Sequence, residues 1–261
     1  MPDTGALRIL VTNDDGIHAP GLKSLEAIAA EISAEVWVVA PETEQSGASH
    51  SLTLADPLRL RKLGDRRYAV KGTPTDCVLM GIKNILPERP DLILSGVNRG
   101  QNLCEDVSYS GTVAAAMEGT ALGVRSIALS QSHGIAGREG LRWHTAQHHG
   151  AELVRRLIGS DWGAGVLINV NFPDCEPEEV KGVEITVQGQ RDQNLVMLDE
   201  RVDARGSAYY WIGFERKRSN PAHGTDLKAV YDNKISVTPL HMDLTQTMAI
   251  PVLQTLFKDG V

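Results

Sequence analysis

The feature that most constrains the fold is a strand, helix and strand pattern near the amino terminus. The apolar run 9–11 is rich in β-branched side chains and ends at polar turn formers, which is typical of a buried strand. Apolar residues at helical spacing follow from 21 to 32, and Pro20 suits the first turn of that helix. A second apolar run at 36–40 indicates another buried strand. This order predicts an α/β fold with a mostly parallel, Rossmann-like sheet sandwiched by helices.

Two adjacent carboxylates, Asp14 and Asp15, stand where the first strand ends. Ligands of open α/β sheets bind beyond the carboxyl ends of the strands. The segment between this strand and its helix lacks the Gly-x-Gly-x-x-Gly pattern of dinucleotide-binding proteins. Two neighbouring carboxylates in a partly desolvated cleft share a proton or hold a cation, and we expect a cation. The alternative is that Asn13 to Gly16 is an ordinary turn.

Two further polar loops are expected at the same edge of the sheet. One, at 41–54, follows the second strand and has its tight point at Ser46 and Gly47. The other, at 96–111, follows a strand at 91–95 and contains Asn98 and Asn102. Carboxylate, hydroxyl and amide oxygens are hard ligands, which favour Mg²⁺ or Mn²⁺ over zinc.

The Ala-rich segment 112–122 predicts a helix that begins near Ser110, Gly111 and Thr112. The N–H groups and partial positive charge of a helix start suit a phosphate, although Ser110 alone could simply cap its helix. A divalent cation beside that phosphate would activate water, so we predict phosphate ester hydrolysis. Asp14 and Asp15 are the catalytic candidates, and the sequence leaves open which of them serves as ligand, general base or nucleophile. Aspartyl phosphatases of the haloacid dehalogenase type carry Asp-x-Asp here, whereas Asn13 precedes Asp15 by two, which disfavours a covalent mechanism.

We expect residues 1–261 to form a single α/β domain with a core at about 1–172. Beyond Asn171 the alternation of strands and helices stops, and about 173–261 is expected to form an extended or exchanged β-rich oligomerisation lobe with a terminal helix. The remaining expected elements are a hairpin at 58–63 and 67–70, a helix capped by Thr73, a strand at 126–130, a helix at 141–158, a strand at 166–171, an extended segment at 183–187, a hairpin around Tyr209 to Trp211, a helical turn at 226–230, a strand at 235–238 and a helix at 244–257 kinked by Pro251.

Composition excludes several classes of protein. A formal net charge of −7 argues against binding a nucleic acid polymer. The chain contains no apolar run near the roughly 20 residues that a membrane-spanning helix needs. The first residues lack a secretory signal pattern, so we expect a cytoplasmic protein. Three cysteines without Cys-x-x-Cys spacing indicate neither disulfides nor zinc, and His144 and His148 lack an acidic partner between them, which disfavours a metal there.

Several linked motifs resemble one family, and the resemblance covers nearly the full length. The motifs are Val-Thr-Asn-Asp-Asp-Gly at 11–16, Ser-Gly-Ala-Ser at 46–49, Gly-Thr-Pro-Thr-Asp-Cys at 72–77, Ser-Gly-Val-Asn-Arg-Gly-Gln-Asn at 95–102, Tyr-Ser-Gly-Thr-Val-Ala-Ala-Ala-Met-Glu-Gly at 109–119, Gly-Thr-Asp at 224–226 and Ile-Ser-Val-Thr-Pro-Leu at 235–240. Together they resemble the SurE family of stationary-phase survival proteins, which are metal-dependent nucleotidases. Glu105 and Asn233 stand where that family often has glycine.

The resemblance implies one divalent metal ion per subunit, held by Asp14, Asp15, Ser46 and Asn98. It also implies hydrolysis of nucleoside 5′-monophosphates and assembly into a homodimer or homotetramer. The predicted phosphate contacts are Gly47, Asn102, Ser110, Gly111 and Thr112. Two alternatives remain open: a broader 3′-nucleotidase or exopolyphosphatase, and a module that senses nucleotide or metal without catalysis.

Overall fold

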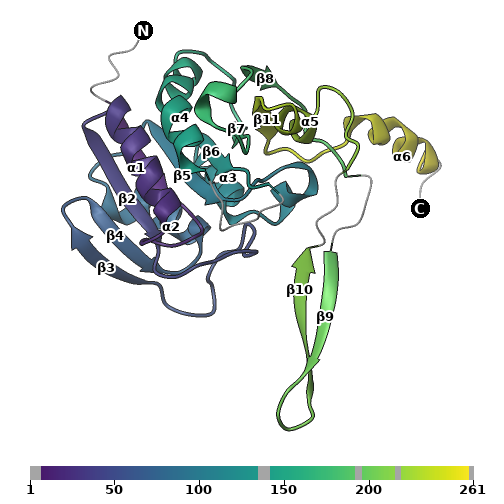
Figure 1. The fold of residues 1–261 in the computed structure, drawn as a ribbon, viewed down its shortest axis with the longest axis horizontal. Helices are drawn as coiled ribbons and strands as arrows, with labels where there is room; N and C mark the ends of the chain where they lie inside the picture. Colours follow the sequence, from purple (N-terminus) through teal and green to yellow (C-terminus); the bar gives the residue numbers. More distant parts are fainter. Residues whose placement is uncertain (1–6, 135–141, 192–195, 215–218, 259–261) are drawn as a thin grey trace.

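A computed structural model describes residues 7–134, 142–191, 196–214 and 219–258, and it shows one large sheet between two layers of helices (Figure 1). The sheet has the strand order β3-β4-β2-β1-β5-β6-β7-β11-β8. Its strands are β1 (Arg8–Thr12), β2 (Glu35–Pro41), β3 (Arg59–Gly64), β4 (Arg67–Lys71), β5 (Leu92–Arg99), β6 (Arg125–Gln131), β7 (Val166–Phe172), β8 (Val183–Ile185) and β11 (Ile235–His241). The predicted α/β fold is confirmed.

Parallel pairing at the centre of the sheet positions the candidate site. β1 pairs in parallel with β2 on one side and with β5 on the other, and β5, β6 and β7 continue in the same direction. The carboxyl ends of β1, β2 and β5 therefore lie together at one edge. The loops that carry Asp14 and Ser46 follow β1 and β2, as the sequence predicted, whereas Asn98 lies inside β5, near its carboxyl end.

Successive residues of β1 point to opposite faces and enter separate cores. Ile9 and Val11 pack with α1 (Pro20–Ile32) and α4 (Trp143–Ile158), whereas Leu10 packs on the other face with α2 (Pro74–Met80) and α3 (Gly111–Ala121). Pro20 occupies the first turn of α1, as expected. The predicted cap of α2 is also confirmed, because Thr73 and Asp76 form a capping box.

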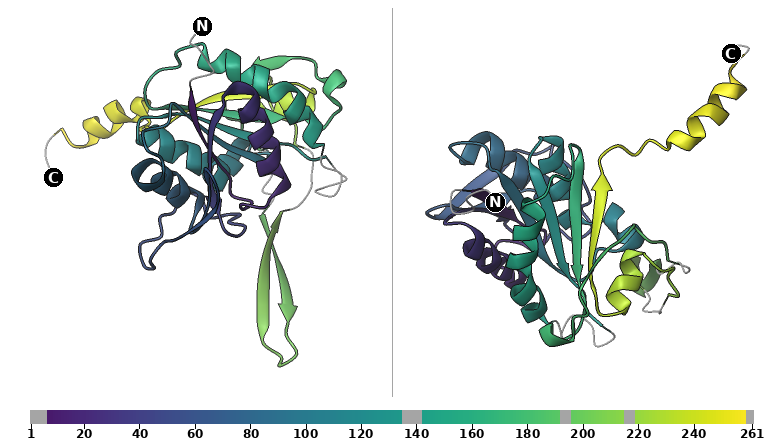
Figure 2. Two further views of the ribbon diagram at one scale, coloured as in Figure 1. Left: turned by 90° about the vertical axis from the view of Figure 1, so that its left-hand side faces the viewer. Right: turned by 90° about the horizontal axis from the view of Figure 1, so that it is seen from above.

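The carboxyl-terminal part of the chain divides into two kinds of structure. The antiparallel strand β11, its neighbour β8 and helix α5 (Asp226–Tyr231) complete the central sheet and pack on it. In contrast, the hairpin of β9 (Val196–Val202) and β10 (Ala208–Phe214) and the helix α6 (Ile250–Leu256) project away from the body (Figures 1 and 2). The central sheet thus extends past the expected core boundary near residue 172.

Three elements differ from the sequence predictions. β5 continues to Arg99, and a 3₁₀ helix, η3 (Cys104–Ser108), occupies part of the segment expected to be a loop. The expected helix at 244–257 is wrong in its start, because only a 3₁₀ turn (Thr247–Ala249) precedes α6. Pro251 lies in the first turn of α6, where no N–H is needed, so it does not kink the helix. The start expected for α4, at 141, falls on the border of 135–141, which lie outside the described residues.

No helix within the described ranges is long and apolar enough to cross a membrane.

Candidate metal and phosphate site

The carboxylate of Asp14 is buried between the end of β1 and the start of α3. The hydroxyl of Thr112 donates a hydrogen bond of 2.5 Å to its Oδ1. The two elements approach so closely that a Cβ on Gly111 would lie 2.8 Å from Cβ of Asp14 and 3.0 Å from Oδ2. Glycine at 111 therefore allows the carboxylate to reach the start of the helix, where N–H groups and the helix dipole stabilise negative charge.

The environment of Asp14 disfavours its charge in the absence of a cation. Burial raises the pKa of Asp14 to about 7, and the adjacent charge of Asp15 adds to this, while the Thr112 hydroxyl and the main-chain N–H groups of Asp14 and Thr112 oppose it. Asn13 lies beside the pair, and among the described residues no donor reaches its buried Oδ1. Two repelling carboxylates beside a buried, unpaired oxygen suit a hard divalent cation with its water molecules.

Asp15 is joined to the strand end that carries Asn98. The main-chain N–H of Arg99 donates to Oδ2 of Asp15 over 3.1 Å. Nδ2 of Asn98 donates to the carbonyl of Gly100 over 2.9 Å, which leaves the amide oxygen as the end that can ligate a cation. The structure thus brings Asp15 and the Asn98 segment together, as predicted.

The loop after β2 is tied to the same strand end. The N–H of Gln45 donates to the carbonyl of Asp14 over 2.8 Å, so the predicted ligand Ser46 is next in the chain to a residue that contacts Asp14. The Ser46 side chain is exposed and donates to Glu44 Oε1. Gly47 has a left-handed φ of 80°, and a Cβ there would meet no atom within 4 Å. The loop is therefore anchored beside Asp14, with its tip open to solvent.

Three of the predicted phosphate contacts, Asn102, Ser110 and Thr112, have structural partners of their own. Ser110 Oγ accepts the N–H of Val113, so Ser110 caps α3, which is the alternative that the sequence left open. Nδ2 of Asn102 donates to Ser130, and the main chain of Asn102 bonds to the side chains of Asn169 and Asn171. Thr112 is engaged with Asp14. Their contact with a phosphate stays a prediction.

The geometry of the Asn98 segment depends on a glycine. Between Ser95 and Asn98 the pairing of β5 with β6 shifts in register, which marks a bulge. Gly96 lies there with a φ of 133°, and a Cβ on it would fall 2.1 Å from the carbonyl oxygen of Leu129. Only glycine fits this position, so the bulge that aims the segment at Asp15 is built into the sequence.

The side chains in the described ranges form no cluster of three or more His, Cys, Asp or Glu residues that could hold a metal. The predicted metal set has two carboxylates and therefore depends on the hydroxyl and amide oxygens of Ser46 and Asn98. His144, which we did not expect to bind metal, lies 2.8 Å from a Glu176 oxygen. The cysteines in positions 77, 104 and 175 are free and buried.

The sequence did not predict the residues that contact the site segments from distant parts of the chain. Arg191 and Asp226 contact the segment after β5, and the Thr112 hydroxyl contacts Asp14 rather than only marking a helix start. Gly-Thr-Asp at 224–226 is one of the motifs of the family resemblance, but no local pattern predicts that Asp226 contacts Cys104. Arg191 carries no sequence signal of any kind.

Comparison with known proteins identifies the family. The model of the family described as survival protein SurE matches residues 9–195. The chain belongs to the SurE family. A protein of Methylobacterium nodulans named 5′-nucleotidase SurE is 64% identical over 240 residues, which cover 92% of this chain and 95% of that protein. A protein of Parvibaculum lavamentivorans with the same name is 62% identical, covering 93% of this chain and 88% of its own.

A solved structure agrees over nearly the whole length. The crystal structure of the SurE protein from Aquifex aeolicus matches with a TM-score of 0.83 and 39% sequence identity. The match covers 95% of this chain and 99% of that one. The similarity to that structure therefore extends beyond the core into the carboxyl-terminal part of this SurE-family chain.

Proposed function

We propose that this chain is a metal-dependent phosphomonoesterase that hydrolyses nucleoside 5′-monophosphates to nucleoside and phosphate. The observation that carries the proposal is the contact of Asp14 with the start of α3, because it joins a cation-binding carboxylate to a helix end that suits phosphate. The names of the relatives, 5′-nucleotidase SurE, support the same substrate class.

One divalent cation per subunit, Mg²⁺ or Mn²⁺, is proposed to bind Asp14, Asp15, Ser46 and Asn98. When bound, it would polarise a phosphate oxygen and lower the pKa of a water molecule. The oxygen-only donor set and the mutual repulsion of the Asp pair fit such a cation. Nitrogen and sulfur ligands are not part of the set, which favours these metals over zinc.

The chain's own residues would orient the reaction. Thr112 holds the Asp14 carboxylate in place through its hydroxyl, and Gly111 lets that carboxylate approach α3. We propose that the phosphate lies beside Ser110 to Thr112, with Gly47 and Asn102 as further contacts. Either carboxylate of the Asp pair can accept a proton from the attacking water, and the other then serves as a ligand only.

The proposal is tested with Asp15→Asn. This change removes one negative charge and keeps the size of the side chain, so we expect Mn²⁺ binding to weaken and phosphate release from AMP to fall at least a hundredfold, as is usual for loss of a catalytic or ligating group. Calorimetry with Mn²⁺ and a phosphate assay give both results, and circular dichroism verifies folding. Asp65→Asn, in the exposed turn between β3 and β4, is the matched control. Undiminished hydrolysis in Asp15→Asn would remove the Asp pair from the mechanism.

The two alternative functions predict different results in the same assay. Turnover of AMP, GMP, a 3′-nucleotide and polyphosphate with Mg²⁺ or Mn²⁺ ranks the substrates. Dominant polyphosphate turnover would identify an exopolyphosphatase. Binding of nucleotide or metal without any phosphate release would identify a sensing module.

We further propose that the chain assembles as a homodimer or homotetramer. A two-stranded hairpin is marginally stable alone in water, yet β9 and β10 project from the body with exposed Leu198, Trp211 and Ile212. α6 is one short helix with exposed Leu253 and Leu256, and a helix of this length also needs packing. Sedimentation velocity tests the assembly, and a monomer across micromolar concentrations would contradict it.

A cytoplasmic location is part of the proposal. Its support is that Cys77, Cys104 and Cys175 are free thiols, as is usual in reducing compartments. Cell fractionation with an antibody against the native protein tests it, and recovery outside the cytoplasm would contradict it.

A further inference from the structure

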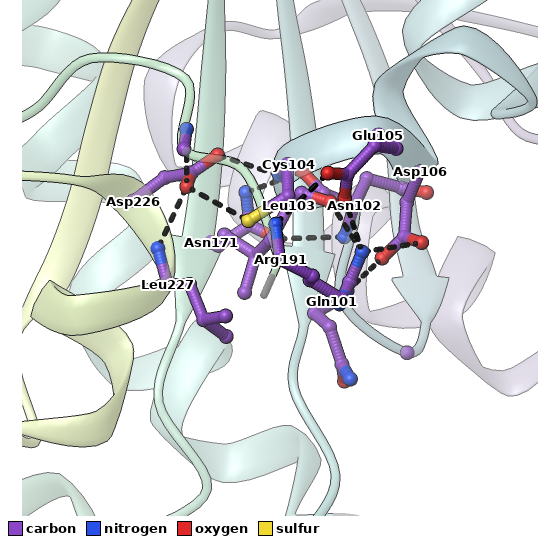
Figure 3. Close-up of polar contacts among 12 residues, drawn as sticks. Gln101, Asn102, Leu103, Cys104, Glu105, Asp106, Asn171, Arg191, Asp226 and Leu227 are labelled. Carbon is purple, nitrogen blue, oxygen red and sulfur yellow. Dashed lines mark hydrogen bonds and ion pairs between the residues drawn. The ribbon is translucent and has the colours of Figure 1, made fainter. Parts of the chain in front are cut away.

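The 3₁₀ helix η3, between the end of β5 and the start of α3, is held by a segment far along the chain (Figure 3). Arg191 lies against it with a side chain that is only 11% exposed. Its Nη2 donates to Oδ2 of Asp106 over 2.6 Å and its Nη1 to Oδ1 over 3.0 Å, so the pair is bidentate. Nη1 also reaches Glu105 and the carbonyl of Leu103. One guanidinium therefore contacts three of the four residues from 103 to 106, namely those at 103, 105 and 106.

The remaining residue of that turn, Cys104, is held by Asp226. The N–H of Cys104 donates to Oδ2 of Asp226 over 2.9 Å, and the main-chain N–H groups of Gly189 and Leu227 donate to Oδ1. Cys104 has a left-handed φ of 56°, which an isolated turn would rarely adopt. A Cβ on Gly189 would lie 2.8 Å from Oδ1 of Asp226 and 3.1 Å from Sγ of Cys104, so the two segments are in direct contact.

Both ends of the clamped turn lead directly to the candidate site. On one side, the carbonyl of Asp106 accepts the N–H of Tyr109, the residue before the cap of α3. On the other side, Asn102 is fixed to β6 and β7, and Arg99 donates its N–H to Asp15. The turn thus joins the strand end that carries Asn98 to the helix start that holds Asp14.

We propose that Arg191 is a positioning residue for the metal and phosphate site, acting through Asp106 on the segment between Asn98 and Ser110. The role of Arg191 in metal and phosphate binding rests on the proposed nucleotidase function. Its effect on the rigidity of the turn does not. The Arg191 guanidinium donates its hydrogen bonds to Leu103, Glu105 and Asp106, so we infer that it acts on the geometry of this turn. A rigid turn presents both ligand-bearing ends in one arrangement, which lowers the cost of ordering them when cation and substrate bind.

The test compares Arg191→Gln with Arg191→Lys and Arg201→Gln. Gln loses the charge and the fork, whereas Lys keeps the charge but loses the bidentate geometry. Arg201 is the matched control. It also pairs with an aspartate, Asp199, but its side chain is exposed on the hairpin. Circular dichroism and thermal melts verify that each variant is folded.

The first measurement is amide hydrogen exchange, which does not depend on activity. We expect the amides of Asp106 and Tyr109 to exchange about tenfold faster in Arg191→Gln, less so in Arg191→Lys, and at the wild-type rate in Arg201→Gln. The second is Mn²⁺ affinity and AMP kinetics. Arg191→Gln should bind Mn²⁺ about tenfold more weakly and raise KM more than it lowers kcat, in the range known for loss of an outer-shell partner.

Each failure has its own outcome. Wild-type exchange at Asp106 and Tyr109 together with wild-type Mn²⁺ affinity in a folded Arg191→Gln protein would overturn the inference. Equal losses in Arg201→Gln would do the same, because they would show a general effect of removing an arginine. A wild-type protein that releases no phosphate from AMP would refute the proposed function, while exchange and Mn²⁺ affinity would still decide on Arg191.

Discussion

The carboxyl edge of β1 and the β9–β10 hairpin differ in which groups they bury and which they expose. At the edge of β1, polar groups are buried and bonded within one chain: Asp14 to Thr112, Asp76 to Thr53 and Thr73. On the hairpin, apolar groups are exposed, with Leu198 at 66% and Ile212 at 71%. Buried polar groups need hydrogen-bond partners within the folded chain. Exposed apolar groups instead need a packing partner, which we expect a second subunit to provide.

This difference indicates which parts of the chain are complete in one subunit and which need a second subunit. The candidate site takes its residues from strand ends of one sheet and from the start of α3, so we expect its geometry to be formed within a subunit. The hairpin and α6 depend on packing from elsewhere. Variants in the first region should therefore change activity or stability without changing assembly, and variants in the second should do the reverse.

The largest effect is expected for Asp76→Ala. The Asp76 carboxylate accepts the N–H groups of Thr53 and Thr73 and the Thr53 hydroxyl, so it caps α2 and anchors the end of the Ser46 loop. Its loss leaves buried donors unpaired, and we expect the free energy of unfolding to fall by about 3 kcal/mol. A thermal melt should shift by roughly 6–10 °C.

Asp76→Asn sharpens that prediction, because it keeps one acceptor oxygen of the carboxylate. We expect a loss between those of the wild type and Asp76→Ala. A melt of Asp76→Ala within about 2 °C of the wild type would show that the loop and cap are not stabilised by this side chain.

The next effect is expected for Gly111→Ala, which acts on activity more than on stability. The new methyl would lie 2.8 Å from Cβ of Asp14 and 3.2 Å from Cγ of Pro74, so Asp14 and α3 must separate. A displacement of about 1 Å near reacting groups costs about a hundredfold, and we expect this loss in kcat/KM for AMP. Gly159→Ala is the control, since its Cβ would make only ordinary contacts at 3.4 Å or more. Sedimentation should be unchanged in both variants.

The hairpin is tested with the double variant Leu198→Ser and Ile212→Ser. The two residues are directly opposite in the β9–β10 ladder, so the change removes one continuous apolar patch. If the two substituted positions together contribute about 2 kcal/mol to a subunit interface, the dissociation constant rises about thirtyfold. A dilution series in sedimentation velocity measures it, with Glu200→Gln as control. An unchanged dissociation constant would mean that this face of the hairpin makes no subunit contact.

Local patterns were sufficient to predict the central strands and the site edge. The apolar runs of β1 and β2 and their parallel order predicted Asp14 beside the Ser46 loop and the end of β5, although Asn98 proved to lie inside β5, and the Thr73 and Asp76 pattern predicted the cap of α2. Long-range pairing was not predictable in this way. β11 joins the sheet antiparallel to β7, and Asp226 contacts Cys104 across 122 positions of sequence, so no local spacing encodes either contact. The start of α6 was misplaced because apolar residues continue on both sides of it.

The smallest effect is expected for Thr112→Val, which probes how much one hydroxyl contributes at the site. Valine keeps the shape of threonine but cannot donate to Oδ1 of Asp14, so a buried carboxylate loses a hydrogen bond. We expect Mn²⁺ affinity and kcat/KM to fall about tenfold, which corresponds to about 1.4 kcal/mol. Thr112→Ser restores the hydroxyl and should restore most of both values. Because the Thr112 side chain is fully buried within one chain, the dissociation constant of the assembly should not move. Wild-type Mn²⁺ affinity in Thr112→Val would show that Asp14 is held by the main chain alone, whereas a change in assembly would break the separation between the two regions.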